Sequence, residues 1–202
     1  GLEQYGVLTL ADGVVGRSVV FDGDSLLAVK DSKTLASNDD GFTFTIWVNP
    51  YRLGGQQQMI AAKNRYALDE RQWGLMIDKD DRFRLYVWQG RWATAAADAA
   101  PQPGRWHCLG VVVRPDVAEL WVNGQRASSV PLTKPIPHTK APLTLGGVND
   151  DGRIWQNLTG ALDDARLFDR PLDAAKMSAL YQPAAGEHLL PAWLTLDAVA
   201  PD

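Results

Sequence analysis

Residues 160–172 read GALDDARLFDRPL, a β-type run in which two carboxylates stand side by side. Successive side chains of a strand point to opposite faces of a sheet, so Asp163 and Asp164 must lie on different faces. An uninterrupted strand groups Leu162, Asp164, Arg166 and Phe168 on one face, and we expect an ion pair between Asp164 and Arg166. Asp163 then faces inward among small apolar neighbours, where a carboxylate needs backbone N–H groups or a cation.

Short β-type runs precede this segment along most of the chain. They span residues 17–22, 25–29, 42–49, 59–63, 72–78, 82–89, 105–114, 117–123, 143–147 and 159–168. Turn signals separate nearly all of them, and Asn123-Gly124 between apolar runs favours a hairpin. No helical block long enough for a crossover lies between strands, which indicates antiparallel sheets in a sandwich or barrel. One short helix is expected over residues 173–181, after Pro171.

The composition is that of an ordinary globular protein of 202 residues, with 46% apolar residues and a net charge of −4. This length suits one large β domain. No polycationic face is visible, so nucleic acid is not an expected partner. No apolar run of about 18 residues is present, which predicts no membrane span. Cys108, the only cysteine, lies in an apolar run and is predicted to be a buried, inert thiol.

Four motifs, spaced in the same order, carry a resemblance to a known family. They are VFDGD at residues 20–24, FTFTIWVNP at 42–50, GRWHCLGV at 104–111 with AELWVNG at 118–124, and residues 160–172. Together they resemble the laminin G-like, concanavalin A-like jelly-roll domains that bacteria append to secreted carbohydrate-active enzymes. The resemblance implies an all-β, two-sheet antiparallel jelly-roll sandwich over residues 1–181, with one short C-terminal helix. It also implies an extracellular or periplasmic location.

The last segment, residues 182–202, is rich in proline and alanine. It is predicted to be either an edge strand of the sandwich or a linker to a further domain of the same polypeptide.

Catalysis is not predicted from the acidic residues. Glycosidases of this fold resemble one another in a Glu-x-Asp-x-x-Glu strand, and retaining hydrolysis needs two carboxyl groups about 5–5.5 Å apart. This chain lacks that pattern. We therefore expect a noncatalytic carbohydrate-binding or spacer module of a larger enzyme. The alternatives are a glycoside hydrolase or lyase with an atypical loop-borne site at Asp69, Glu70 and Asp151, and a protein-interaction domain.

A structural calcium ion is implied by the resemblance, bound by the carboxylate of the final strand and an early glycine carbonyl. Here Asp163 matches the carboxylate and Gly23 the carbonyl, with Asp22 or Asp24 as further oxygen donors. Calcium accepts such mixed oxygen ligands. The alternative is that Asp163 only accepts hydrogen bonds from backbone N–H groups.

Eight tryptophans stand out as candidates for either core or ligand contacts. Trp47, Trp106 and Trp121 lie within β-type runs and are predicted to be core residues. Trp88 and Trp92 flank a turn, and Trp155 lies in a polar loop, so these three are predicted to stack on sugar rings. The polar partners and further loop residues expected to contact the glycan are Asn149, Asp151, Arg153, Tyr51, Arg71 and Trp73. The alternative is that Trp92 and Trp155 cover sheet edges.

Overall fold

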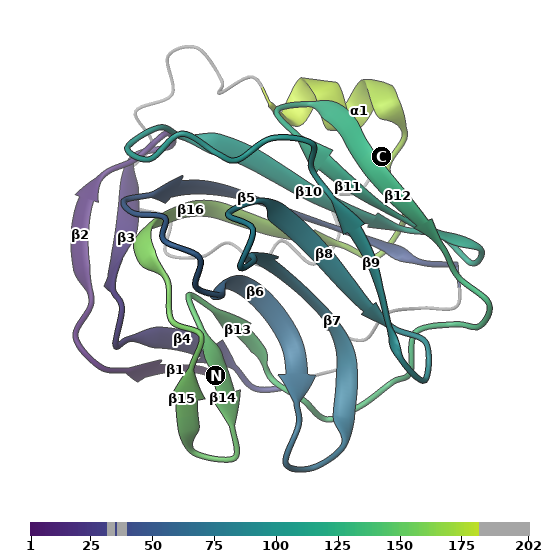
Figure 1. Ribbon diagram of the computed structural model, residues 1–202, viewed down its shortest axis with the longest axis horizontal. Helices are drawn as coiled ribbons and strands as arrows, with labels where there is room; N and C mark the ends of the chain where they lie inside the picture. Colours follow the sequence, from purple (N-terminus) through teal and green to yellow (C-terminus); the bar gives the residue numbers. More distant parts are fainter. Residues whose placement is uncertain (32–34, 36–39, 182–202) are drawn as a thin grey trace.

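Figure 1 shows the computed structural model, which describes residues 1–31, 35 and 40–181. Sheet A contains, in spatial order, β1 (Leu2–Tyr5), β4 (Leu26–Val29), β13 (Leu143–Leu145), β6 (Gln58–Arg65), β7 (Glu70–Ile77), β8 (Phe83–Trp88) and β9 (Trp92–Ala96). Sheet B contains β12 (Gln125–Pro131), β11 (Val117–Val122), β10 (His107–Val113), β5 (Phe42–Pro50), β16 (Thr159–Phe168), β3 (Arg17–Asp22) and β2 (Thr9–Asp12). A separate hairpin is formed by β14 (Val148–Asp150) and β15 (Arg153–Trp155).

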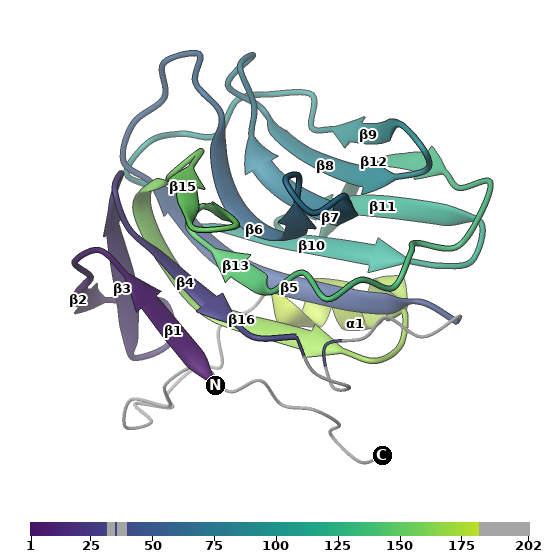
Figure 2. The same ribbon diagram turned by 90° about the horizontal axis from the view of Figure 1, so that it is seen from below.

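The two sheets pack face to face, with a single apolar core between them (Figure 2). Alternation along the strands produces this layer, as in β8, where Phe83, Leu85 and Val87 point inward and are almost completely buried. All strand pairs within the sheets are antiparallel. The predicted two-sheet jelly-roll sandwich is therefore confirmed. Residues 182–202, predicted to be an edge strand or linker, lie outside the described residues.

The helix α1 (Ala174–Leu180) covers the outer face of sheet B. Asp173 caps its N-terminus by accepting a hydrogen bond from the Lys176 backbone N–H at 2.9 Å. Below the helix, Met177 packs against Trp121. Trp47 stacks on the ring of Tyr181, which follows α1. Trp47 and Trp121 are therefore buried as predicted, but beneath the helix rather than between the sheets, while Trp106 is only half-buried.

Cys108 lies on β10 and is buried, in agreement with the prediction. Burial, followed by the charge of Asp164, raises the pKa of the thiol to about 12. The thiolate is the reactive form of cysteine. We therefore expect the native protein to react slowly with a chromogenic disulfide reagent at mildly alkaline pH, and one thiol per chain to appear after unfolding in urea. Rapid reaction of the native protein would contradict the buried assignment.

The predicted alternation of residues 160–172 is broken by a β-bulge in β16. The ladder pairs Asp163 with Trp47 but Arg166 with Thr45, so β16 contains one more residue than β5 across this step. Asp164 occupies the left-handed region with φ +46°. The predicted Asp164–Arg166 ion pair is present, with 2.8 Å between Oδ1 and Nε.

The bulge changes which side chains reach the core. Those that face the core are Leu162, Ala165 and Leu167. The prediction that Leu162, Asp164, Arg166 and Phe168 share a face was therefore wrong, because one inserted residue reverses the alternation after it. Phe168 packs with the residues under α1 instead. Asp163, predicted to face inward, lies beside Trp47 on the outer face of sheet B.

Candidate aromatic binding face

Five aromatic side chains gather on the outer face of sheet A and are called here the aromatic cluster: Tyr66, Tyr86, Trp88, Trp92 and Trp155. Strand alternation explains their position. Val87 of β8 points into the core, so its neighbours Tyr86 and Trp88 point out. The register pairs Trp88 with Trp92 across the β8–β9 hairpin, which puts both indoles on the same face.

The rings of the aromatic cluster form a continuous series of contacts. Trp92 is central, with ring centroids 5.1 Å from Trp88, 6.0 Å from Tyr86 and 6.1 Å from Tyr66. Tyr66 connects this group to Trp155, at 5.6 Å. All five side chains are half-buried, so each ring packs on its neighbours and still presents part of its surface to solvent. Such a surface suits stacking on an apolar ligand face.

The β14–β15 hairpin brings Trp155 to this face. The two strands lie outside both sheets, against the outer face of sheet A (Figures 1 and 2). Val148 packs on Met59, Ala62 and Met76, a small apolar cluster separate from the main core. Trp155 packs against the edge of the same cluster. The hairpin thus packs on sheet A through apolar contacts and is not paired with it as a further strand.

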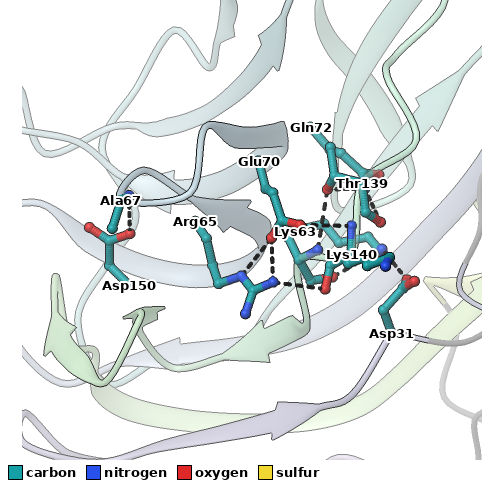
Figure 3. A network of polar contacts seen from close by, with 10 residues as sticks. Asp31, Lys63, Arg65, Ala67, Glu70, Gln72, Thr139, Lys140 and Asp150 are labelled. Carbon is teal, nitrogen blue, oxygen red and sulfur yellow. Dashed lines mark hydrogen bonds and ion pairs between the residues drawn. The ribbon is translucent and has the colours of Figure 1, made fainter.

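Polar contacts fix the tip of the hairpin and the neighbouring β6–β7 turn (Figure 3). Asp150 Oδ1 accepts a hydrogen bond from the Ala67 backbone N–H at 2.7 Å. Glu70 forms an ion pair with Arg65 and also accepts a hydrogen bond from the Lys140 backbone N–H at 3.3 Å. These contacts hold the segment around Tyr66 between the hairpin and the loop that contains Lys140.

Arg71 stacks inside the aromatic face. Its guanidinium carbon lies 5.2 Å from the ring centroid of Tyr66 and 5.0 Å from that of Trp88, which are cation–π distances. Arg153 has a similar contact with Trp155, at 5.7 Å. Burial raises the pKa of the Tyr66 phenol above its usual value. Tyr66 is therefore neutral at physiological pH.

A polar group lies next to the aromatic cluster on the same face. The Tyr86 hydroxyl donates to Asp78 Oδ2 at 2.6 Å, and Gln57 donates to Asp78 Oδ1 at 2.9 Å. Burial, followed by the hydrogen bond to Asp78, raises the pKa of Tyr86. Arg84 completes the group through an ion pair with Asp78 at 2.9 Å. Tyr86 is thereby fixed in orientation next to Trp92.

The structure brings together most of the predicted ligand residues. Those located at the aromatic face are Trp88, Trp92, Trp155, Arg71 and Arg153. Asn149 and Asp151 lie at the tip of the β14–β15 hairpin, where Asn149 accepts a hydrogen bond from the Gly152 N–H and Asp151 has φ +55°. Tyr51 lies on the loop after β5, with 45% of its surface exposed.

Trp73 does not belong to the face, and its prediction as a ligand residue was wrong. It is 2% exposed and packs between the sheets against Phe42 and Phe44. Its position within β7 rather than in a loop explains the difference, because its register partner Val87 is also a core residue. Sequence reasoning also missed Tyr66, Tyr86 and Asp150. The alternation in β8 identifies Tyr86, but nothing local identifies the other two.

Two of the three acidic residues considered for a loop-borne catalytic site, which were Asp69, Glu70 and Asp151, have structural partners. Glu70 is paired with Arg65, and Asp69 is paired with Arg71. Both ion pairs lie at the β6–β7 turn, where they have a structural role.

The calcium site implied by the resemblance does not fit the residues present. The β16–β3 ladder places Thr159 opposite Asp22 and Leu162 opposite Val19, so Asp163 lies about 13 Å along the ladder from Asp22. The Asp22 carboxylate instead accepts hydrogen bonds from the Asp24 N–H at 3.0 Å and the Ser25 hydroxyl at 2.9 Å. Within the described residues, no group of three or more metal-binding side chains occurs.

Asp163 has a different set of partners from those of a calcium ligand. Its Oδ2 accepts a hydrogen bond from the Val15 backbone N–H at 2.8 Å. Burial raises the pKa of this carboxyl, while the backbone N–H groups of Val15, Val14 and Asp164 act to lower it. A Cβ placed on Gly13 would lie 2.3 Å from that same oxygen, so only glycine permits this approach. The β2–β3 loop is thus wrapped around the carboxylate.

The fold and the aromatic face together define a jelly-roll β-sandwich domain with one ring-lined outer surface. The chain belongs to the concanavalin A-like lectin/glucanases superfamily, of the laminin G type, which matches residues 21–178. No curated protein matches the sequence.

Solved structures share the fold at low sequence identity. Domain 4 of AbnA, a GH43 extracellular arabinanase from Geobacillus stearothermophilus solved with arabinotriose, has a TM-score of 0.70 and 21% identity over 88% of this chain and 82% of that chain. The binding domain of Paraclostridial Mosquitocidal Protein 1 has a TM-score of 0.74 and 15% identity, and the match covers 90% of this chain and 47% of that chain. The Botulinum neurotoxin serotype G binding domain has a TM-score of 0.71 and 14% identity, over 90% of this chain and 46% of that chain. This chain thus spans about half the length of the toxin domains.

None of the helices in the described part of the chain has the length and apolarity needed to cross a membrane.

Proposed function

We propose that this domain is a noncatalytic carbohydrate-binding module and that the aromatic cluster is its glycan-binding surface. The observation that carries the proposal is the continuous series of half-buried rings from Trp88 through Trp92 and Tyr66 to Trp155. Isolated exposed aromatic residues are ordinary, but a contiguous set with polar groups at its border is typical of a ligand site.

The chemistry of sugars matches this surface. A pyranose or furanose ring presents C–H groups on one face, which stack on an indole or phenol, and hydroxyl groups at its edge. Arg71, Arg153 and Asp151 border the aromatic cluster and can bond such hydroxyl groups. Because the rings are already packed on one another, little side-chain entropy is lost when a ligand binds.

A place within a larger extracellular or periplasmic carbohydrate-active enzyme is part of the same proposal. Its support is the resemblance in sequence and the shared fold with the domain of an extracellular arabinanase. In this arrangement, other domains of the same polypeptide supply catalysis, and this domain keeps the enzyme near its polymer.

Alanine substitution of the central ring tests the proposal. We expect Trp92→Ala and Trp155→Ala to weaken glycan binding at least about tenfold, since loss of a stacked aromatic removes apolar contact worth more than 1 kcal/mol. A glycan array first identifies ligands, and affinity electrophoresis in polysaccharide gels measures the loss. Tyr181→Ala is the matched control, because Tyr181 is 40% exposed on the opposite side of the sandwich.

Three results would contradict the proposal and identify the alternatives. If the domain binds no glycan on a diverse array, the result favours a spacer role. Turnover of a polysaccharide by the purified chain favours an enzyme. Capture of a protein partner that no sugar displaces favours a protein-interaction domain.

A further inference from the structure

Arg71 is the charged group most closely built into the aromatic cluster. Tyr66 and Trp88 both contact its guanidinium, and Trp92 contacts the same two rings. Arg71 thus occupies a position in the ring series equivalent to that of another aromatic residue. Its side chain keeps 21% of its surface exposed, so the guanidinium is fixed in direction but accessible from solvent.

The protein partner of Arg71 is weakly held. Asp69 forms the ion pair, but its side chain is 85% exposed and belongs to the β6–β7 turn, where its φ is +56°. Ion pairs with so exposed a carboxylate contribute little to stability. A ligand carboxylate can therefore replace Asp69 at small cost, and the planar guanidinium can bind it through two parallel hydrogen bonds.

Further cations border the same surface. Arg153 lies over Trp155, and Arg91 lies in the turn between Trp88 and Trp92. Lys134 Nζ lies at that turn too, 3.4 Å from the position of a Cβ on Gly90. The side chain of Gln89 anchors the Lys134 backbone with hydrogen bonds of 2.9 and 3.1 Å.

Carboxylates also lie near this surface, and each keeps its charge when it accepts a hydrogen bond. Asp150 accepts from the Ala67 N–H, Asp78 is paired with Arg84, and Asp69 is paired with Arg71. The Arg71 pair is the one whose carboxylate is 85% exposed, so a ligand carboxylate that displaces Asp69 reaches the guanidinium without leaving a buried charge unpaired.

We propose that the glycan bound by the aromatic cluster carries carboxylate groups, that is, uronic acid residues, and that Arg71 recognises one of them by exchanging it for Asp69. This inference rests on the proposed glycan-binding function and adds the chemical class of the ligand. The guanidinium stacked between Tyr66 and Trp88 pairs with the carboxylate, while Trp92 and Trp155 stack on sugar rings.

Matched pairs of polysaccharides test the ligand class. The probes are polygalacturonate against its methyl ester, and alginate and hyaluronan against their carboxyl-reduced forms, each by affinity electrophoresis and calorimetry. We expect at least one acid form to bind about tenfold or more tighter than its neutral partner. We also expect that affinity to fall as sodium chloride rises from about 50 to about 500 mM, because salt screens exposed charges. Dextran sulfate reports whether any polyanion suffices.

Substitutions at the ion pair separate recognition from structure. Arg71→Met keeps much of the apolar contact and should weaken binding of the acid form about tenfold or more, and should weaken binding of the neutral form much less, since only hydrogen bonds to hydroxyl groups are lost there. Arg71→Lys keeps the charge but lacks the planar guanidinium group, so its affinity for the acid form should lie between those of Arg71→Met and the parent protein. Asp69→Asn should tighten binding about threefold by removing the competing carboxylate, and asparagine tolerates the positive φ. Arg170→Met, in the segment between β16 and α1, controls for net charge.

The outcomes distinguish this inference from the proposed function. Trp92-dependent binding of neutral glycans alone would overturn the carboxylate assignment and leave the glycan-binding proposal intact. Absence of binding to every acid and neutral probe would overturn both. Weaker binding in Asp69→Asn would show that Asp69 orients Arg71 rather than competes for it, which also overturns the exchange. Equal affinity for dextran sulfate would reduce the interaction to general polyanion attraction and overturn the uronate assignment.

Discussion

Replacing Asp163 by alanine should lower the free energy of unfolding by about 3 kcal/mol. The carboxylate is half-buried and accepts a hydrogen bond from the Val15 backbone N–H, so the substitution leaves that donor without its acceptor. Unfolding in urea, followed by tryptophan fluorescence, measures the loss. In a domain of this size it corresponds to a fall in melting temperature of about 6–12 °C.

Asp163→Asn is the matched control, because the amide oxygen still accepts from Val15. Desolvation raises the pKa of Asp163, which means that burial destabilises the ionised carboxylate in the folded protein. With the folded pKa above the unfolded one, the contribution of Asp163 is greatest at low pH and declines as pH rises through the folded value. We therefore expect Asp163→Asn to lower the free energy of unfolding by less than about 1 kcal/mol at neutral pH. The stability of the variant relative to the parent protein should be higher at about pH 6 than at about pH 3.

A calcium ion at Asp163 would give a different pattern. A carboxylate that ligates calcium cannot be replaced by an amide without loss of affinity, so Asp163→Asn and Asp163→Ala would be similarly destabilised. Chelator treatment would also lower the melting temperature of the parent protein, and added calcium would restore it. The hydrogen-bonding role predicts no response to either treatment.

Removing the partner of the buried Lys63 should destabilise the fold by a similar amount. Lys63 is 3% exposed on β6, and its Nζ lies 2.6 Å from Asp31 Oδ1 and 3.1 Å from the Ala141 carbonyl oxygen (Figure 3). Asp31→Ala leaves a buried ammonium group with only the neutral carbonyl as partner. We expect a loss of about 3 kcal/mol in the free energy of unfolding, measured by urea denaturation.

The double substitution provides the control for this ion pair. Lys63→Met removes the cation that Asp31 balances, so Asp31→Ala combined with Lys63→Met should recover most of the loss of Asp31→Ala alone. Asp31 is partly exposed, and Lys63→Met alone should therefore cost less than Asp31→Ala. Strict additivity of the two single substitutions would contradict a direct coupling between the side chains.

The strands with strong local patterns could be predicted from the sequence. Residues 17–22 and 159–168 match β3 and β16 at both ends, and the helix expected at 173–181 differs from α1 by one residue at each end. These segments combine β-branched or aromatic residues, or helix formers after a proline, with clear turn signals. Local pattern and tertiary structure agree there.

The strands that were missed have weak patterns of their own. They are β1, β2, β9, β12, β14 and β15. The edge strand β12 is the clearest case, because its sequence QRASSVP is polar and mostly exposed, and it is a strand only through its pairing with β11. Such strands depend on a neighbouring ladder rather than on propensity.

The candidate site was predicted in part. Trp88 and Trp92 flank a turn, and a hairpin register follows from that sequence, so their meeting on one face could be expected. The approach of Trp155 to Tyr66 depends on a hairpin that docks across the sheet. Such a long-range contact leaves no local signal. The β-bulge at Asp164 could not be predicted either, because a single inserted residue changes the sheet face on which the following side chains lie without changing the composition of the strand.

The β14–β15 hairpin belongs to neither ladder, and this separation has a consequence for how the domain family can diversify. The length and sequence of the hairpin can vary while the strand pairs of both sheets stay intact, provided that two contacts are kept. These are the packing of Val148 on sheet A and the hydrogen bond from the Ala67 N–H to Asp150. Grafting a hairpin from another member onto this scaffold should therefore transfer part of a ligand preference, much as loop exchange does on an immunoglobulin framework.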